Sequence, residues 1–346
     1  MPKIKKTRIT SIKEIAKLAD CSIATVSNII NGKGRVSEPV RKKVLKICRE
    51  HQYVPRSGGR NLRLGRNETV GLLFFPTCAS IFRNIYYAEI MEALEAEMEE
   101  RGHDLLLSGY NVSQSSSETP RFVRQGKVDG IILLGRFPRS EIMRIQDYGI
   151  PAIQLDGYRD RIKMDYVTSD GFSACAEVVD HLVGLGHRRI VFMAYEEENS
   201  NAERREMGFN FAISKHSLPP KHSHSCRDFT NTAAAYENLT KLLQGKHPPT
   251  ALIAVNDTLA TELQSFLQAD GYTIPEDLSI FGFNNDAHSM KSNPQISTVN
   301  FNKKMLGKMG AEMIIRRINS PDMPVQGYSL ACELIHRNSV APPSAT

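Results

Sequence analysis

Residues 11–64 read SIKEIAKLADCSIATVSNIINGKGRVSEPVRKKVLKICREHQYVPRSGGRNLRL. Ser11 is followed three residues later by Glu14, the spacing of a capping box, which predicts the start of a helix. Apolar residues then recur at helical spacing until Asp20, and a second cap, Ser22, restarts the pattern. Two short helices joined by a tight turn predict a helix-turn-helix unit.

The second of these helices has two different faces. The apolar pattern turns Val26, Ile29 and Ile30 inward. The remaining side chains face outward, and these are Ile23, Ala24, Thr25, Ser27 and Asn28. If the N-terminal end of this helix entered a major groove, they would lie against base edges and phosphates. Other small helical domains carry similar caps, so the caps alone leave the function open.

Charge favours a nucleic-acid partner for this segment. Residues 1–66 hold 17 Lys and Arg against 4 Asp and Glu, a net charge of +13, whereas the remaining residues hold 27 against 34, a net charge of −7. Opposite signs in the two parts predict that a polyanion binds the N-terminal part, through phosphate neutralisation and counterion release. A solvated charged face is the alternative, but caps and apolar periodicity run through the same residues.

The composition sets further limits. The chain has 346 residues, 41% of them hydrophobic, enough for a small N-terminal domain and a larger body. It has no run of eighteen apolar residues and no signal peptide, so we expect it in the cytoplasm and without a membrane partner. Its six cysteines form no CxxC pair, so we expect reduced thiols, with no disulfide and no zinc site.

Residues 68–340 alternate short β-branched runs with amphipathic helices, which predicts parallel α/β layers. A helix is expected over 86–101, with apolar residues on one face and glutamates on the other. The predicted strands are 70–75, 104–108, 130–134, 152–155, 189–193, 251–255 and 278–283. Sheets of this type bind ligands beyond the carboxyl ends of their strands.

Motifs along nearly the whole chain resemble the LacI/GalR family of repressors. In the N-terminal part they are TSIKEIAKLADCSIATVSNIIN at 10–31, VSEPVRKKVLKICREHQYVP at 36–55 and RNL at 60–62. In the body they include VGLLF at 70–74, VDGIILLG at 128–135, LGHRRIVFMA at 185–194, TALIAVNDTLA at 250–260 and ELIHRNSV at 333–340. So many motifs in the same order make the resemblance specific.

The resemblance implies a DNA-binding headpiece with a hinge at 1–66 and a core at 68–340 that resembles periplasmic sugar-binding proteins. Lobe 1 would comprise about 68–165 and 300–326, lobe 2 about 166–299 and 327–340, with a tail at 341–346. The chain would cross between the lobes near 165, 299 and 327, and a ligand would bind in the cleft. The implied partners are a second copy of the chain and pseudopalindromic double-stranded operator DNA. Because no heptad tail follows residue 340, we expect a dimer rather than a tetramer.

The resemblance also implies which residues contact DNA. Ile23, Ala24 and Asn28 would face the groove, and residues 56–64 would form a hinge helix with Leu62 as a minor-groove wedge. Gly58 and Gly59 make that hinge helix costly to form. The full set is Ser11, Ser22, Ile23, Ala24, Thr25, Ser27, Asn28, Asn31, Arg35, Ser37, Tyr53, Arg60 and Leu62.

The effector would contact Tyr86, Tyr87, Asp156, Arg205, Asn256, Asp257 and Asn284. Arg205 is the principal anchor, because a guanidinium fork recognises hydroxyl pairs or a carboxylate with fixed geometry. Asn284 stands where the family usually has Asp, so the donor pattern of the ligand should differ. The segment 111–127 is shorter than the resemblance leads us to expect. The acidic run 196–198 would repel anions if it faced the cleft, which favours a neutral sugar or a related molecule.

Other function classes find little support. The chain carries no GxSxG, P-loop, HExxH or dinucleotide-binding motif, so we expect neither an enzyme nor a cofactor. His216, His222, His224 and Cys226 permit a metal, but we expect an exposed connector and no metal. A solute-binding or sensory protein without a DNA role is the alternative, and the +13 headpiece and the missing signal peptide disfavour it.

Overall fold

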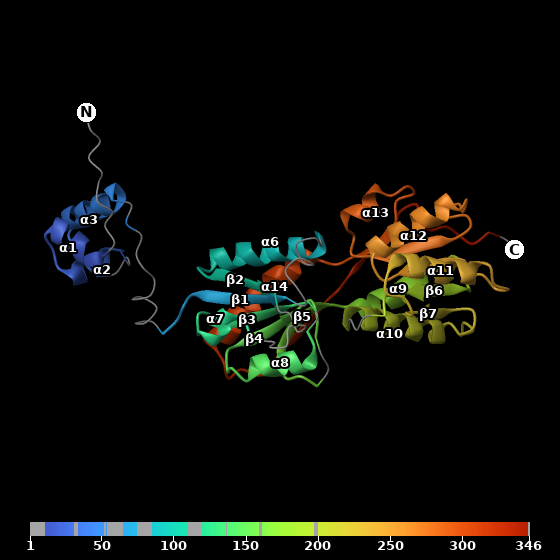
Figure 1. Cartoon of the computed structure of the whole chain (residues 1–346), viewed down its shortest axis with the longest axis horizontal. Helices are drawn as coiled ribbons and strands as arrows, with labels where there is room; N and C mark the ends of the chain where they lie inside the picture. The colour runs from blue at the N-terminus through green and yellow to red at the C-terminus, as the bar shows by residue number, and fades with distance from the viewer. Residues whose placement is uncertain are drawn as a thin grey trace, which may run out of the picture. The chain divides into compact units, whose positions relative to one another are not determined.

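A computed structural model describes residues 11–30, 34–51, 53, 65–74, 85–109, 119–135, 137–158, 161–196 and 200–344. The chain divides into two compact units, residues 1–67 and 68–346. The second unit contains two sheets (Figure 1). Among the described residues, no helix is both long and apolar enough to cross a membrane.

The first unit contains the predicted helices, α1 (Ile12–Ala19), α2 (Ile23–Ile30) and α3 (Glu38–Glu50). Both halves of the capping box form: the Glu14 amide donates to Ser11 Oγ at 3.3 Å, and the Ser11 amide donates to Glu14 Oε2 at 3.3 Å. Asp20 ends α1 in the left-handed region, with φ of 53°. Ile15, Val26 and Val44 are fully buried where the three helices meet, so one small apolar core holds the unit together.

The first sheet of the second unit is entirely parallel. Its strands, in spatial order, are β11 (Gly327–Leu330), β5 (Asp165–Ser169), β4 (Ala152–Leu155), β3 (Gly130–Leu134), β1 (Thr69–Phe74) and β2 (Asp104–Gly109). Side chains of alternate strand residues pack on opposite faces. Ile132 and Leu134 pack with α6 (Ile85–Glu100) and α14 (Lys303–Asn319), whereas Ile131 and Leu133 pack with α7 (Arg121–Arg124) and α8 (Arg139–Gln146).

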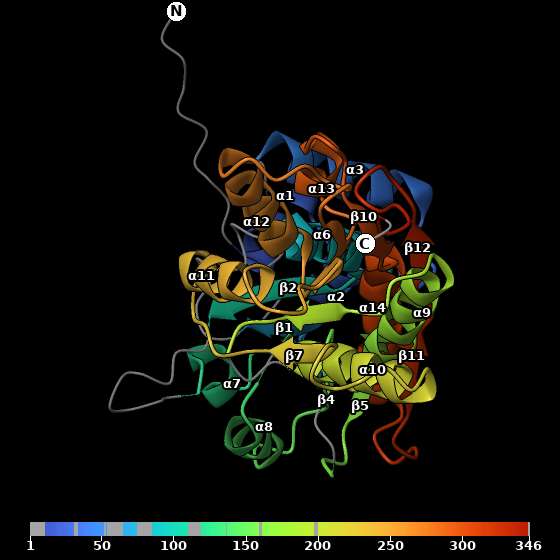
Figure 2. The ribbon, with the colours of Figure 1, turned by 90° about the vertical axis from the view of Figure 1, so that its right-hand side faces the viewer.

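The second sheet repeats this plan with one antiparallel edge strand. Its order is β12 (Glu333–Ile335), β10 (Ser297–Asn300), β9 (Ser279–Phe283), β8 (Ala251–Ala254), β6 (Ile190–Met193) and β7 (His224–Cys226), and β12 runs antiparallel to β10. Figures 1 and 2 show helices on both faces of this sheet. They are α9 (Gly171–Gly184), α10 (Ser200–Lys215), α11 (Thr232–Leu243), α12 (Asp257–Ala269) and α13 (Ala287–Lys291).

The fold class predicted from the sequence is confirmed, but two of the lobe crossings lie later than expected. β5 and β11 both belong to the first sheet, so the chain crosses after Ser169 and after Leu330 rather than near 165 and 327. The reason lies in Asp165, whose carboxylate is paired with Arg317 of α14 at 2.7 and 2.8 Å. This pairing keeps a polar strand inside the first lobe.

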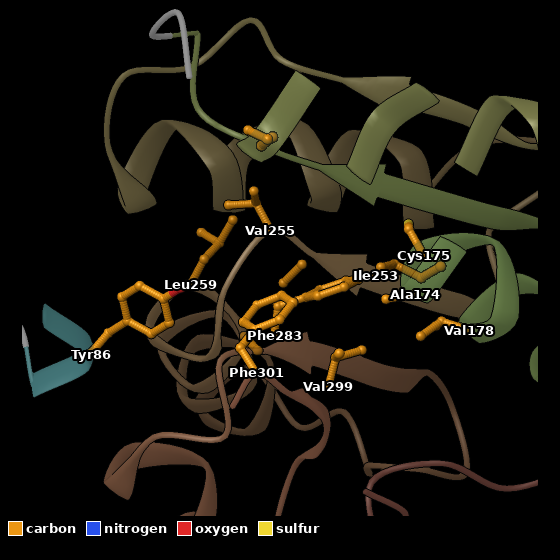
Figure 3. Close-up of a cluster of buried hydrophobic side chains, with 14 of the residues drawn as sticks. Tyr86, Ala174, Cys175, Val178, Ile253, Val255, Leu259, Phe283, Val299 and Phe301 are labelled. Atoms are coloured by element: carbon orange, nitrogen blue, oxygen red, sulfur yellow. The ribbon is translucent and has the colours of Figure 1, made fainter. Parts of the chain in front are cut away.

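Aromatic side chains pack where the two sheets approach each other. Figure 3 shows Tyr86, Phe283 and Phe301 within one buried cluster. The ring centroids of Tyr86 and Phe301 are 6.3 Å apart, and those of Phe283 and Phe301 are 6.0 Å apart. Since Tyr86 comes from α6 and Phe283 from β9, this cluster joins the two lobes beside the polar site described next.

Candidate functional site

Three of the five side chains predicted to face outward on α2 are exposed, and the other two, Thr25 and Ser27, are half-buried. The Ser22 hydroxyl accepts from the Thr25 amide at 3.0 Å and so caps the helix. Ile23 is 46% exposed, and Ala24 and Asn28 are exposed as well, whereas Val26 and Ile29 are buried. An apolar pair and an amide thus lie on the exposed side of a helix whose N-terminal turn is capped by Ser22.

The other residues predicted to contact DNA fall into three groups. Arg35 and Ser37 are exposed, so phosphate contact is open to them. Ser11 is engaged in its cap, and Thr25, Ser27 and Tyr53 are half-buried, with Tyr53 packed against the headpiece core. Asn31, Arg60, Leu62 and the Gly58–Gly59 pair lie outside the described residues.

A cavity of about 120 Å³ lies between the two lobes. Six of the seven residues predicted to bind the effector line it: Tyr86, Tyr87, Asp156, Arg205, Asn256 and Asn284. Residues that the prediction did not include also line it, namely Tyr195, Asn201, Ala202 and Val255. The cavity is far smaller than the roughly 300–1,000 Å³ of drug-sized pockets, so it suits a small metabolite.

Asp257 is the exception, because it does not line the cavity, and its role in effector binding stays a prediction. Its side chain is fully buried away from the cavity, accepting from Thr298 Oγ1 at 2.6 Å and from the Asp286 amide at 2.9 Å. Burial raises the pKa of Asp257 to about 7. The neighbouring Asn256 is the N-cap of α12 and lines the cavity, whereas Asp257 is the first helical residue and joins β10 to the loop after β9.

Backbone geometry aims the polar side chains into the cavity. Asp156 directly follows β4 with φ of 56°, and Asn284 directly follows β9 with φ of 107°. Asp and Asn are the non-glycine residues that best tolerate positive φ. Gly208 allows α10 to approach α9, because a Cβ there would lie 2.1 Å from the Phe172 carbonyl oxygen. That close approach sets the position of Arg205 on α10.

Asp156 is buried and only partly satisfied. Its Oδ1 accepts from the Tyr86 hydroxyl at 2.8 Å and from Asn201 Nδ2 at 3.2 Å, whereas Oδ2 has no partner among the described residues. Burial raises the pKa of Asp156 to about 6, against the hydrogen bonds from Tyr86, Asn201 and Tyr87 and the positive charge of Arg205. Burial, followed by the charge of Asp156, raises the pKa of Tyr86 well above its ordinary value.

Arg205 presents a guanidinium held by aromatic rings. Its Cζ lies 4.8 Å from the ring centroid of Phe283 and 4.7 Å from that of Phe301. Nη1 donates to the carbonyl oxygen of Val255, and Nη2 lies 3.5 Å from Asn284 Oδ1. Burial lowers the pKa of Arg205. The rings fix the plane of the fork, so its remaining N–H groups have a defined direction.

Residues of both lobes meet around this site. Asn201 of α10 reaches Asp156 of the first lobe. Lys303 of α14 donates to the carbonyl oxygen of Asn284 at 3.0 Å and pairs with Glu89 of α6 at 3.0 Å. The cavity therefore lies beside contacts that join the two lobes.

The residues missed by sequence reasoning carried a usable signal. Val255 directly follows β8 and Tyr195 lies two residues after β6, both at the carboxyl ends of strands where ligands bind. Asn201 lies one turn before Arg205 on the same helix face. The acidic run predicted near the cleft is different: Glu196 is exposed and outside the cavity, and residues 197 and 198 lie outside the described ranges.

The histidines of the segment 216–226 contact different groups. His216 Nε2 lies 2.6 Å from Asp180 Oδ1, and the ring of His222 lies 4.4 Å from that of His247. His224 belongs to the edge strand β7. Within the described ranges, no group of three or more His, Cys, Asp or Glu side chains could hold a metal ion.

An exposed recognition helix and an interlobe polar cavity define a DNA-binding protein with a ligand-binding body. Residues 11–56 match the family of bacterial regulatory proteins named after the lac repressor (lacI family), and residues 179–340 match the periplasmic binding protein-like domain. The N-terminal part therefore carries the DNA-binding domain of this family of bacterial regulatory proteins, followed by a periplasmic binding protein-like body.

Similar proteins cover most or nearly all of the chain, and the lac repressor, at 18% identity, shows a shared fold. A probable transcriptional repressor of Bacillus subtilis, ExuR, is 26% identical over 335 residues, which cover 96% of this chain and 98% of that protein. The lac repressor dimer bound to operator and an anti-inducer has a TM-score of 0.83 at 18% identity, covering 96% and 99%. An Enterococcus faecium LacI-family regulator with bound ribose has a TM-score of 0.68 at 26% identity, covering 79% of this chain and 99% of that one.

Proposed function

We propose that this protein is a transcriptional repressor that binds a pseudopalindromic operator as a homodimer and changes its operator affinity when a small sugar-like metabolite fills the interlobe cavity. The observation that carries the proposal is the pairing of two separate sites. A headpiece with net charge +13 exposes Ile23, Ala24 and Asn28, and the body encloses a polar cavity formed by both lobes. The similar proteins named above are regulators, and the proposal includes no catalytic step.

The recognition helix α2 would read bases with three side chains. Ile23 and Ala24 carry no side-chain donor or acceptor, so they favour thymine methyl groups, whereas Asn28 can pair with adenine N6 and N7. The half-site would therefore be rich in A·T pairs at these positions. Arg35 and the other basic residues of the headpiece would supply phosphate contacts that do not depend on sequence. A protein that binds an operator would work in the cytoplasm, where bacterial DNA lies.

Control by the ligand would follow from where the cavity lies. Tyr86 and Asp156 belong to the first lobe, and Arg205 and Asn284 belong to the second. A ligand that contacts all four favours the lobe arrangement in which those contacts form together. If that arrangement differs in operator affinity, ligand binding and DNA binding are coupled by the same free energy in both directions.

The edge of the first sheet supports a homodimer. β2 pairs only with β1 among the described strands, and its Leu106 and Leu107 are 36% and 49% exposed. Exposed edge strands with apolar side chains are surfaces that proteins usually cover. Sedimentation of the wild type should therefore report a dimer, and Leu107→Lys should yield monomers. A tetramer, or a Leu107→Lys variant that sediments like the wild type, would contradict this assignment.

Selection from genomic fragments tests the function as a whole. Purified protein is incubated with sheared DNA of its source genome at two salt concentrations, and the retained fragments are sequenced. A specific operator binder keeps enriching the same fragments as salt rises, because base contacts survive when phosphate contacts are screened. A solute-binding protein without a DNA role would retain nothing specific at either salt concentration, and that result would reject the proposal.

A further inference from the structure

Arg205 is a buried cation that forms no ion pair with a described carboxylate, although the charge of Asp156, which lines the same cavity, acts on it. Its side chain belongs to a residue that is 7% exposed, and its Nε has no hydrogen-bond partner in the part of the chain that the structure describes. No carboxylate oxygen of the described residues lies within 4.0 Å of a guanidinium nitrogen of Arg205, the distance that defines an ion pair. The acceptors it reaches are uncharged, namely the carbonyl oxygen of Val255 and the amide oxygen of Asn284 at 3.5 Å.

The neighbouring cations are paired. Arg204, the preceding residue on α10, lies 3.9 Å from Asp170 and donates to the Tyr158 hydroxyl. Lys303, on the other side of Asn284, lies 3.0 Å from Glu89. Burial of a charge is costly unless the charge is paired and hydrogen-bonded, and Arg205, unlike Arg204 and Lys303, has no carboxylate among the described residues within 4.0 Å.

Asp156, which lines the same cavity, also has an unsatisfied polar atom. Asp156 is 2% exposed, and its Oδ2 has no partner among the described residues although its Oδ1 accepts two hydrogen bonds. An orphaned carboxylate oxygen requires a hydroxyl or amine donor. Both unmet groups border the same cavity of about 120 Å³.

We infer that the effector is a small hydroxylated carboxylate of the sugar-acid class, whose carboxylate pairs with Arg205 and whose hydroxyl donates to Oδ2 of Asp156. Guanidinium and carboxylate groups form paired, charge-assisted hydrogen bonds, and the aromatic rings beside Arg205 hold the fork in one plane. The inference rests on the proposed function, in which this cavity holds the effector. It differs from the expectation of a neutral sugar, which rested on the acidic run 196–198; Glu196, the described residue of that run, does not line the cavity.

Asn284 determines this charge preference. Its amide oxygen faces Arg205 where a carboxylate would neutralise the guanidinium. Asn284→Asp should therefore do two things in the full-length protein. Without any ligand it should raise the melting temperature by roughly 2–4 °C, the size of shift that a modest stabilisation gives in a domain of this length. With ligand present it should weaken the response to acids, because the ligand carboxylate would then meet a negative charge.

Two variants make the ligand-free measurement specific. Asn302→Asp adds the same charge at an exposed N-cap of α14, where Asp and Asn are equivalent caps, and it should leave the melting temperature near that of the wild type. In an Arg205→Met background, Asn284→Asp should no longer raise the melting temperature, because the cation that the new carboxylate would pair with is absent. A gain that persists without Arg205, or no gain in the wild-type background, would overturn the inference.

A panel of matched compounds tests the ligand class directly. The melting temperature of the wild-type protein is followed with D-galacturonate, D-glucuronate and D-gluconate, and with D-galactose, D-glucose and D-glucitol as their neutral counterparts. At least one acid should raise it in a concentration-dependent manner, its neutral counterpart should not, and Arg205→Met should abolish the rise. A rise with neutral sugars alone, or no rise with any of the three acids, would overturn the inference. Selection of genomic DNA on the same preparation tests the proposed function separately, so the two failures are distinguishable.

Discussion

Replacing Asp156 with Asn should change how stability depends on pH, because this carboxyl group is buried with its Oδ2 unpartnered among the described residues. Burial raises the pKa of Asp156 to about 6, from an ordinary value of 3.8. The folded state therefore holds the proton more tightly than the unfolded state. Below pH 3.8 the carboxyl group of Asp156 is protonated in both the folded and the unfolded state, so its ionisation does not lower the free energy of unfolding. As pH rises from there through about 6, the wild type loses the stability that the protonated form gave.

The magnitude follows from the size of the shift. A difference of about two pKa units, at about 1.4 kcal/mol per unit, corresponds to roughly 3 kcal/mol lost by the wild type between pH 4 and pH 7.5. Asn cannot ionise, so Asp156→Asn removes this part of the pH dependence. Asn keeps the acceptor oxygen for Tyr86 and is close to Asp in shape. Relative to the wild type, the variant should therefore gain stability steadily as pH rises over this window.

The assay is urea unfolding followed by circular dichroism at several pH values from 4 to 7.5, without ligand. The informative quantity is the difference between variant and wild type, in which the titration of all other groups cancels. The exposed Asp322→Asn is the matched control, and its curve should run parallel to that of the wild type. If the Asp156→Asn difference were equally flat across the window, the description of Asp156 as a destabilised buried anion would be refuted.

Three further changes test other parts of the account. Asn28→Ala should weaken the binding free energy by about 1–3 kcal/mol at one base pair and relax the sequence preference there. Binding to operators mutated at single positions measures both effects. An equal loss of affinity for all sequences would contradict the reading of a base by Asn28. Gly208→Ala should destabilise the body by roughly 1–3 kcal/mol, because the added Cβ would clash with the Phe172 carbonyl oxygen. Gly184→Ala is the control, because the space around its Cβ is open, and it should not destabilise the body. Equal urea midpoints for the two variants would contradict the close approach of α10 to α9. Replacing Gly58 and Gly59 together by Ala should tighten operator binding with little change in ligand affinity, since each Gly in a helix interior costs about 1 kcal/mol relative to Ala. Unchanged operator affinity would mean that the hinge forms no helix on DNA.

The sequence predicted the parts of the fold that depend on local patterns. Every strand with a continuous apolar run, such as β3 and β8, appears within a residue or two of its predicted bounds. The missed strands lack such a run. β5 reads DYVTS and begins with Asp165, a residue that is acceptable inside the lobe only because Arg317 pairs with it. A partner so distant in sequence cannot be inferred from local periodicity.

The same limit applies to single side chains. The glutamates of α6 were expected on its solvent face, but Glu97 is buried and bonds Arg101 one turn later. Asn256 and Asp257 are adjacent polar residues after one strand, and nothing in the sequence separates the cap that lines the cavity from the helical residue buried behind it. The site residues that follow strands could be predicted, but the direction of each side chain depends on backbone angles such as the φ of 107° at Asn284.

The central claim is that occupation of the cavity and binding of the operator are coupled. The most direct measurement is a fluorescence anisotropy titration of the selected operator fragment, with and without the compound that raises the melting temperature. We expect the operator Kd to change by about 5-fold or more, the usual range of allosteric coupling, and Arg205→Met to remove the change while still binding DNA. An operator Kd that stays the same at saturating compound would contradict the account.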